Sequence, residues 1–199
     1  VERSLRFNDD DSAYLSRTPS STSNRRTFTI SWWFKLGNLG TTRAFFGAYD
    51  NSTSGDNNYY FSCSLGTDDK LYFGAWNQNW RGTSRLFRDP NAWYHCVVAV
   101  DTTQSTASNR VKIYINGTQE TSFSTNNDPA EDLDLGWNFN AQLHTIGRVN
   151  YTTGSGPYPF DGYIAEFNSI DGSQLTPSSF GETNSKTGQW IPKKYSGSY

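Results

Sequence analysis

Methionine is absent from the 199 residues, and cysteine occurs only twice, at Cys63 and Cys96. Two cysteines are too few for a disulfide framework, so we expect two buried free thiols, with a single disulfide as the alternative. Because a primary translation product begins with Met and this chain begins with Val1, we expect a processed chain or a piece of a longer one.

The chain also lacks a strong net charge and a long apolar run. The formal net charge is −2, and no basic stripe occurs of the kind that binds phosphates, which argues against nucleic acid as a partner. No apolar run approaches the roughly 18–20 residues that span a bilayer, so we expect no membrane insertion. The N-terminal sequence "VERSLRFNDDDSAYL" has no apolar segment of the signal-peptide type.

Aromatic residues, by contrast, make up 16% of the chain, and they fit the pleated, half-buried surface of a sheet. Residues 26–36, "RTFTISWWFKL", alternate with a period of two. This predicts a strand with one buried face, which consists of Phe28, Ile30, Trp32, Phe34 and Leu36. Residues 110–123 predict a hairpin that turns at Asn116-Gly117.

Strand patterns continue along the chain, with turns at intervals of roughly 8–12 residues, as in β-sandwiches. The only helical turn that we predict is at "TPSSFGE", with Thr176 as N-cap before Pro177. We therefore expect an all-β domain over residues 1–182, an antiparallel β-sandwich of jelly-roll type. Residues 183–199 are expected to be a polar C-terminal tail or the start of a following segment.

An ordered series of motifs resembles a known family. The motifs are "AWYHCVVAVD" (92–101), "RVKIYINGTQ" (110–119), "LHTIGR" (143–148) and "FDGYIAEFNSIDGSQLT" (160–176). Together they resemble the laminin-G-like, pentraxin-type branch of the concanavalin A-like jelly rolls. Two further stretches, residues 4–40 ("SLRFNDDDSAYL…FKLGNLG") and 171–197 ("DGSQLTPSSFGE…IPKKYSG"), are similar to virion-associated proteins of tailed phages, especially marine ones.

The last motif places an acid, Glu166, in a predicted strand between Ile164 and Phe167. A carboxylate there loses hydration and must accept hydrogen bonds, so we expect Glu166 to be structural, as the resemblance also implies. Glycoside hydrolysis needs two carboxylates roughly 5–9 Å apart, and the E-x-D-x-E pattern of glucanases with this fold is absent. His95 and His144 are expected to be satisfied strand histidines. No catalytic residue is predicted, and we expect no enzyme.

Acidic clusters raise the question of calcium, which takes roughly six to eight oxygen ligands. The clusters are Asp9–Asp11, Asp50 with Asp56, and the acids of residues 128–134. Asp50 and Asp56 are the metal ligands we predict if calcium binds, and solvated turns are the alternative. The position just after the "LHTIG" strand, where pentraxins carry acidic calcium ligands, reads Arg148-Val149-Asn150 and has no carboxylate. No other cofactor is indicated.

Aromatic rings beside amide groups favour sugar recognition, because a ring covers the apolar face of a sugar and polar groups bind its hydroxyls. The candidate ligand-binding residues of one predicted loop are Trp76, Asn77, Asn79, Trp80 and Arg81. Secondary candidates are Trp137, Tyr151 and Tyr158. The alternative is that Trp76 and Trp80 cap the sandwich or line a subunit contact.

Two functions of different classes follow. In the first, the chain is a non-enzymatic domain of a phage tail fibre, spike or capsid surface that recognises a glycan or another host-surface group. In the second, it is a purely architectural domain that decorates the capsid or tail through protein–protein contacts. An extracellular laminin-G-type adhesion module is a further alternative.

The resemblance also implies a place and partners for the chain. It implies a location on the surface of a phage particle assembled in the bacterial host cytoplasm. The implied partners are other virion proteins, and homo-oligomerisation is left open.

Overall fold

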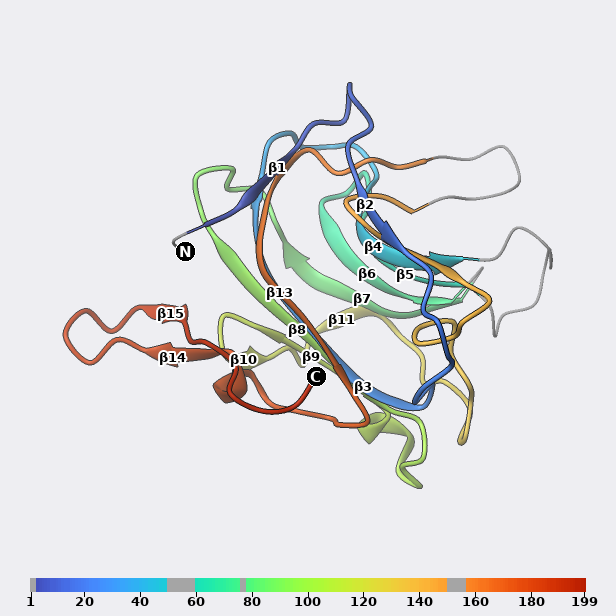
Figure 1. The fold of residues 1–199 in the computed structure, drawn as a ribbon. Coiled ribbons are helices and arrows are strands. Elements are labelled where there is room, and N and C mark those ends of the chain that lie inside the picture. Colours follow the sequence, from blue (N-terminus) through green and yellow to red (C-terminus); the bar gives the residue numbers. More distant parts are fainter. Residues whose placement is uncertain (1–2, 50–59, 76–77, 150–156) are drawn as a thin grey trace.

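The computed structural model describes residues 3–49, 60–75, 78–149 and 157–199. Within these ranges, two antiparallel sheets pack face to face, and a small third sheet lies near the C-terminus (Figure 1). This confirms the predicted antiparallel β-sandwich. Neither of the two helical turns in these ranges is long and apolar enough to cross a membrane.

The strands of the first sheet are, in spatial order, β1 (Leu5–Phe7), β13 (Gly162–Asp171), β3 (Thr27–Leu36), β8 (Tyr94–Asp101), β9 (Val111–Ile115) and β10 (Thr118–Gln119). Those of the second sheet are β11 (Phe123–Asn126), β7 (Gln78–Leu86), β6 (Lys70–Ala75), β5 (Phe61–Leu65), β4 (Arg43–Tyr49), β12 (Leu143–Ile146) and β2 (Leu15–Arg17). The third sheet pairs β14 (Gly181–Thr183) with β15 (Trp190–Pro192). The short edge strands β1 and β2 therefore end the two large sheets.

Aromatic side chains fill the space between the two large sheets. The five apolar residues predicted to face inward from β3 are all at most 3% exposed. Trp32 meets Phe46 of the opposite sheet edge-to-face, with 4.9 Å between ring centroids. Complete burial of a large apolar side chain stabilises a fold by about 1.5–3 kcal/mol, so this interior is the main source of stability.

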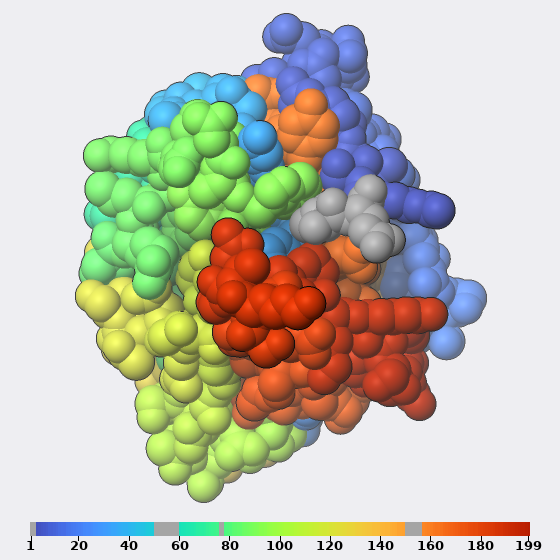
Figure 2. Space-filling model, turned by 90° about the vertical axis from the view of Figure 1, so that its left-hand side faces the viewer, coloured from blue at the N-terminus to red at the C-terminus, as the bar shows by residue number. Residues whose placement is uncertain are grey.

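The other face of β3 is also buried, so the prediction of a single buried face is wrong. Thr29, Ser31 and Trp33 are at most 4% exposed. The cover is the C-terminal segment, which lies across this side of the molecule (Figure 2). Thr29 Oγ1 donates to the Ser173 carbonyl at 2.7 Å and accepts from the Leu175 amide at 2.8 Å.

Trp190 of β15 anchors this C-terminal segment. Its indole Nε1 donates to His95 Nδ1 at 2.9 Å, and the His95 ring stacks in turn on Trp33. Gly117 and Gly181 make room for the indole, because a Cβ atom at either position would come within 2.8 Å of a ring atom. Residues 183–199 therefore contain a strand that is attached to the sandwich.

Two local sequence predictions are confirmed. Asn116 and Gly117 have φ values of +49° and +82°, as a type I′ turn requires, and they connect β9 to β10. The predicted helical turn is the 3-10 helix η2 (Pro177–Ser179), with Thr176 at its N-cap. The other 3-10 helix is η1 (Ala107–Asn109).

Cys63 on β5 and Cys96 on β8 are free and buried, as expected. Each is 0% exposed. Burial raises the pKa of both thiols well above the ordinary value, so they remain protonated and act as small core side chains.

Candidate functional site

The predicted binding residues Trp80 and Arg81 lie inside the molecule, so the prediction that they face a ligand is wrong. They belong to strand β7, which begins at Gln78. The side chain of Trp80 packs on Phe73 in the core, and Trp80 is 1% exposed. Arg81 is 2% exposed; it donates to the carbonyls of Asn127 and Val111 and pairs with Asp128. Because these carbonyls and the Asp128 carboxylate occupy its guanidinium group, the buried Arg81 has a structural role.

The other predicted ligand-binding residues are dispersed. Asn79 is exposed, and its backbone carbonyl accepts from Asn127 Nδ2 at 3.1 Å. Tyr158 is half-buried and packs against a small apolar cluster rather than forming an open platform. Trp76, Asn77 and Tyr151 lie outside the described residues, as do the predicted metal ligands Asp50 and Asp56.

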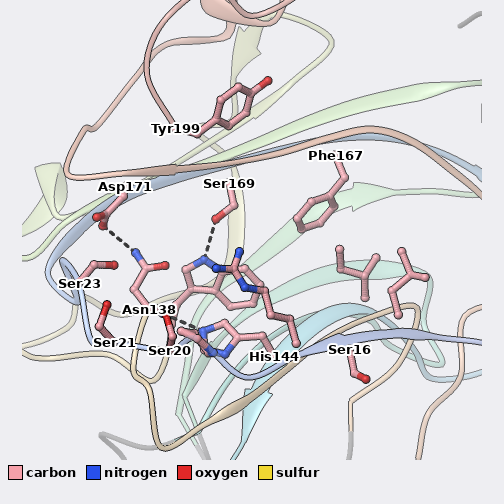
Figure 3. A pocket seen from close by; sticks show the side chains of 15 residues that line it. Ser16, Ser20, Ser21, Ser23, Asn138, His144, Phe167, Ser169, Asp171 and Tyr199 are labelled. Carbon is pink, nitrogen blue, oxygen red and sulfur yellow. Dashed lines mark hydrogen bonds between the residues drawn. The ribbon is translucent and has the colours of Figure 1, made fainter.

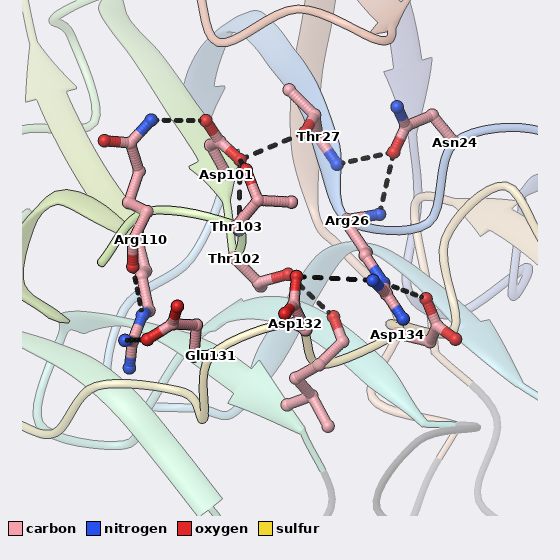
Figure 4. Close-up of polar contacts among 12 residues, drawn as sticks. Asn24, Arg26, Thr27, Asp101, Thr102, Thr103, Arg110, Glu131, Asp132 and Asp134 are labelled. Carbon is pink, nitrogen blue, oxygen red and sulfur yellow. Dashed lines mark hydrogen bonds and ion pairs between the residues drawn. The ribbon is translucent and has the colours of Figure 1, made fainter. Parts of the chain in front are cut away.

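Arginines neutralise the acidic segment 128–134 (Figure 4). Arg26 pairs with Asp134 at 2.8 Å and with Asp132 at 3.3 Å. Arg110 pairs with Glu131 at 2.9 Å. Across the described residues, no group of three or more His, Cys, Asp or Glu side chains is arranged to hold a metal.

Glu166 is exposed, so the expectation of a dehydrated, hydrogen-bonded carboxylate there is wrong. The reason is a β-bulge: the register with β3 shifts between Ala165 and Asn168, and Glu166 adopts a φ of +48°. The buried acid of this segment is instead Asp161, 8% exposed, whose Oδ1 accepts from Arg6 Nη1 at 2.6 Å.

Both histidines are satisfied within the fold, as expected. His95 Nε2 lies 2.9 Å from Ser31 Oγ, and burial lowers the pKa of His95 to about 3. His144 Nε2 accepts from the Asn138 amide at 2.8 Å, and its Nδ1 lies 3.0 Å from the Gln142 carbonyl. Burial lowers the pKa of His144 to about 4, so both rings are neutral at pH 7.

A pocket of about 590 Å³ lies where the β2 edge of one sheet approaches β13 of the other (Figure 3). Its walls come from segments far apart in the sequence, namely residues 15–23, 137–146 and 167–171, with Tyr199 at the border. Ser16, Ser20, Ser21 and Ser23 contribute hydroxyls, and we call this site the serine-rimmed pocket.

Trp137 provides the aromatic wall, and among the described candidates it is the one that lines this pocket. Its Nε1 donates to Ser169 Oγ at 2.9 Å, and its ring packs 4.6 Å from His144 and 5.5 Å from Phe46. Trp137 is 4% exposed. Phe167 adds a half-buried ring to the lining.

Asn138 holds the polar wall in place. Its φ is +64°, and its Nδ2 donates to the Asn24 carbonyl at 2.9 Å and to Asp171 Oδ1 at 3.0 Å. The Asn24 amide donates to the same Asp171 oxygen at 3.0 Å. These contacts connect the 22–24 segment to β13, so the wall is formed before any ligand arrives.

The rim offers polar groups that the fold does not use. In the described part of the chain, the side chains of Ser20, Ser21, Ser23 and Arg17 make no hydrogen bond, and all four residues are exposed. Among the lining residues that the structure describes, Asp171 is the one carboxylate. The lining therefore suits a polar ligand of low net charge with one apolar face, and it lacks the carboxylate pair of a glycosidase.

A laminin G family model, described as the concanavalin A-like lectin/glucanases superfamily, matches residues 8–178. A search of curated protein sequences finds no match.

Three solved structures show the same fold at low identity. A heptameric pentraxin from Limulus polyphemus is 18% identical, with a TM-score of 0.51 over 82% of this chain and 71% of that one. NanB sialidase from Streptococcus pneumoniae is 17% identical, with a TM-score of 0.58 over 92% of this chain. A CBM40 domain of a Ruminococcus gnavus sialidase, bound to α2,3-sialyllactose, is 10% identical, with a TM-score of 0.52 over 78% of each chain.

The extent of these matches limits what they imply. This chain spans only 29% of the NanB sialidase. Identities this low establish a shared fold, and a shared fold does not by itself imply a shared chemistry.

Proposed function

From the premise that the chain belongs to the concanavalin A-like lectin/glucanases superfamily, we propose that it is a non-enzymatic recognition module that binds a glycan. The binding site is the serine-rimmed pocket. One observation carries the proposal: a hollow of about 590 Å³ in which indole and phenyl rings meet serine hydroxyls that make no hydrogen bond among the described residues. Such a lining matches the two kinds of surface that a sugar ring presents.

The fold relatives support a glycan as the ligand class. The CBM40 domain of similar fold is described in complex with a sialyllactose. The described lining of the pocket carries one arginine and one carboxylate, and Asp171 already accepts two hydrogen bonds from the fold. A neutral or singly acidic saccharide that meets Arg17 at the rim fits these charges.

We further propose that the module acts on a phage particle, as a tail-fibre, spike or capsid-surface domain beside other virion proteins. The support is the likeness of the two ends of the chain to virion-associated proteins. The heptameric pentraxin of similar fold is compatible with a homo-oligomer. Immunogold labelling of purified particles with antibody against this chain tests the location, and particles without label would count against it.

A glycan array tests the binding function. Wild-type protein is expected to bind a restricted set of saccharides, and Ser21→Trp is expected to weaken binding by at least about tenfold, or 1.4 kcal/mol, because the indole fills the pocket. Ser122→Trp is the matched control. It changes another exposed serine next to β11, at the opposite edge of the same sheet, and should bind like wild type.

The architectural alternative predicts a different result. In that case neither wild-type protein nor the Ser21→Trp variant binds any saccharide, and particles that carry the Ser21→Trp variant are defective in assembly. Equal glycan binding by wild type and Ser21→Trp would show instead that the saccharide binds elsewhere on the molecule.

A further inference from the structure

A second hollow of about 200 Å³ adjoins the serine-rimmed pocket between the edges of the two large sheets. The two share Leu15, Ile146 and Phe167 as lining residues, so they lie side by side. The rest of the lining of the second hollow, which we call the edge hollow, is mainly apolar and includes Leu5, Phe7 and Ile164.

The bulge in β13 shapes the edge hollow. Glu166 and Phe167 together oppose Trp32, since Ala165 pairs with Trp33 and Asn168 with Ser31. Phe167 points inward and meets Phe46 with 5.7 Å between ring centroids, while Glu166 turns to the solvent side. The bulge thus places an exposed carboxylate and an inward-facing ring next to each other in the lining of the edge hollow.

Two leucines at the sheet edges remain exposed to water. Leu5 on β1 is 53% exposed and Leu15 on β2 is 48% exposed. Apolar surface in contact with water costs about 25 cal/mol per Å² relative to buried surface. A ligand that covers both leucine side chains would therefore gain binding free energy. Arg3 and Glu166 also line this hollow with opposite charges, so it presents no net charge to a ligand.

We propose that the edge hollow takes the aliphatic part of an amphipathic saccharide, such as an alkyl glycoside or an acylated sugar, whose sugar ring lies in the serine-rimmed pocket. The inference rests on the proposed function and names its ligand class. From one hollow to the next, the lining changes from the hydroxyls of Ser20, Ser21 and Ser23 to leucine and isoleucine side chains beyond Phe167. The volume of about 200 Å³ accommodates a short alkyl chain, and the mainly apolar lining favours such a chain over a second sugar with its hydroxyls.

The test compares methyl and octyl glycosides of glucose, galactose and mannose by isothermal titration calorimetry, with all probes below their micelle concentrations. For the sugar that binds, the octyl glycoside is expected to bind at least about tenfold more tightly than the methyl glycoside. Leu5→Gln and Ser4→Trp are expected to remove this advantage and leave the methyl glycoside unaffected, because both residues line only the edge hollow.

Leu86→Gln is the matched control, because Leu86 is 42% exposed on β7 and lines neither hollow. It should keep the full octyl advantage. Equal affinity for methyl and octyl glycosides would overturn the inference and leave the proposed glycan site standing.

Further outcomes would also overturn the inference. If octyl glycosides bind Ser21→Trp as tightly as wild type, the sugar is not held in the pocket. If Leu5→Gln abolishes a concentration-dependent dimer and changes no glycoside affinity, the edge hollow is a contact between copies. If no saccharide binds in either assay, the inference falls together with the proposed function.

Discussion

The ion pair between Arg43 and Asp69 is one of the most enclosed charge contacts in the molecule. Their side chains are 0% and 7% exposed, and the two groups are 2.7 Å apart. Asp69 also accepts from the Gly40 amide at 2.9 Å and from Arg88 Nε at 3.1 Å. Removal of the carboxylate charge would leave a buried guanidinium without its counter-ion.

We therefore predict that Asp69→Asn lowers the free energy of unfolding by about 3–5 kcal/mol, the range for breaking a buried pair from one side. Glu166→Gln should change it by less than about 0.5 kcal/mol, because that carboxylate is exposed. Urea unfolding of both variants measures the difference. If Glu166→Gln instead lowers the free energy of unfolding by several kcal/mol, the Glu166 carboxylate has a structural role after all.

The attachment of β14 and β15 to the first sheet depends on space for one indole. Gly117 lies in the β9–β10 turn and has both a positive φ and the Trp190 ring against its Cα, whereas Gly172 has a φ of +68° and open space around it. Both glycines therefore need a left-handed backbone, but of these two positions a Cβ atom would meet the Trp190 ring only at Gly117.

Gly117→Ala is accordingly predicted to destabilise the protein by more than Gly172→Ala. Both substitutions cost about 1–2 kcal/mol because alanine disfavours the left-handed backbone, and Gly117→Ala also displaces Trp190. The Trp190→Ala variant should show a smaller difference between the two substitutions. Thermal unfolding of the single and double variants provides the measurement, and equal losses for both alanines would contradict the contact with the ring.

Sequence patterns predicted strands best where the polar and apolar sides alternate over many residues. β3 and the Asn116-Gly117 hairpin follow from period and turn chemistry alone. Strand β7 was not predicted, because its asparagine, glutamine and glycine are typical of a loop, so Trp80 and Arg81 were expected at the surface. The bulge at Glu166 could not be foreseen, because glutamate seldom adopts a positive φ.

The serine-rimmed pocket could not be predicted for a different reason. Its lining comes from three segments whose proximity depends on the order of strands in both sheets. Trp137 was found through its aromatic and amide neighbours in sequence. The serines at 16, 20, 21 and 23 carry no signal apart from that of an ordinary polar connection.

At the scale of the whole molecule, the two neutral histidines make stability depend on pH between about pH 4 and pH 6.5. The pKa values of His95 and His144 fall from 6.5 to about 3 and about 4 on folding. Between those values and pH 6.5 the unfolded chain binds protons that the folded chain does not. The contribution of these two histidines to stability is therefore fully present above about pH 6.5 and decreases as the pH falls toward 4.

Urea unfolding between pH 7.5 and pH 4.5 is predicted to show a loss of up to about 1.4 kcal/mol per pH unit for each histidine. His144→Gln should reduce the slope by about one proton, whatever its effect on stability at pH 7.5. A slope that is unchanged in this variant would show that His144 titrates normally in the folded protein.

The two thiols in the core have a practical consequence. Because Cys63 and Cys96 are unbonded and shielded from water, no cross-link has to form or survive for the sandwich to hold. The protein should tolerate dithiothreitol without a change in melting temperature, and it should refold from denaturant without an oxidant. Alkylating reagents should label it only after it unfolds, which makes thiol modification a convenient readout for every stability measurement described above.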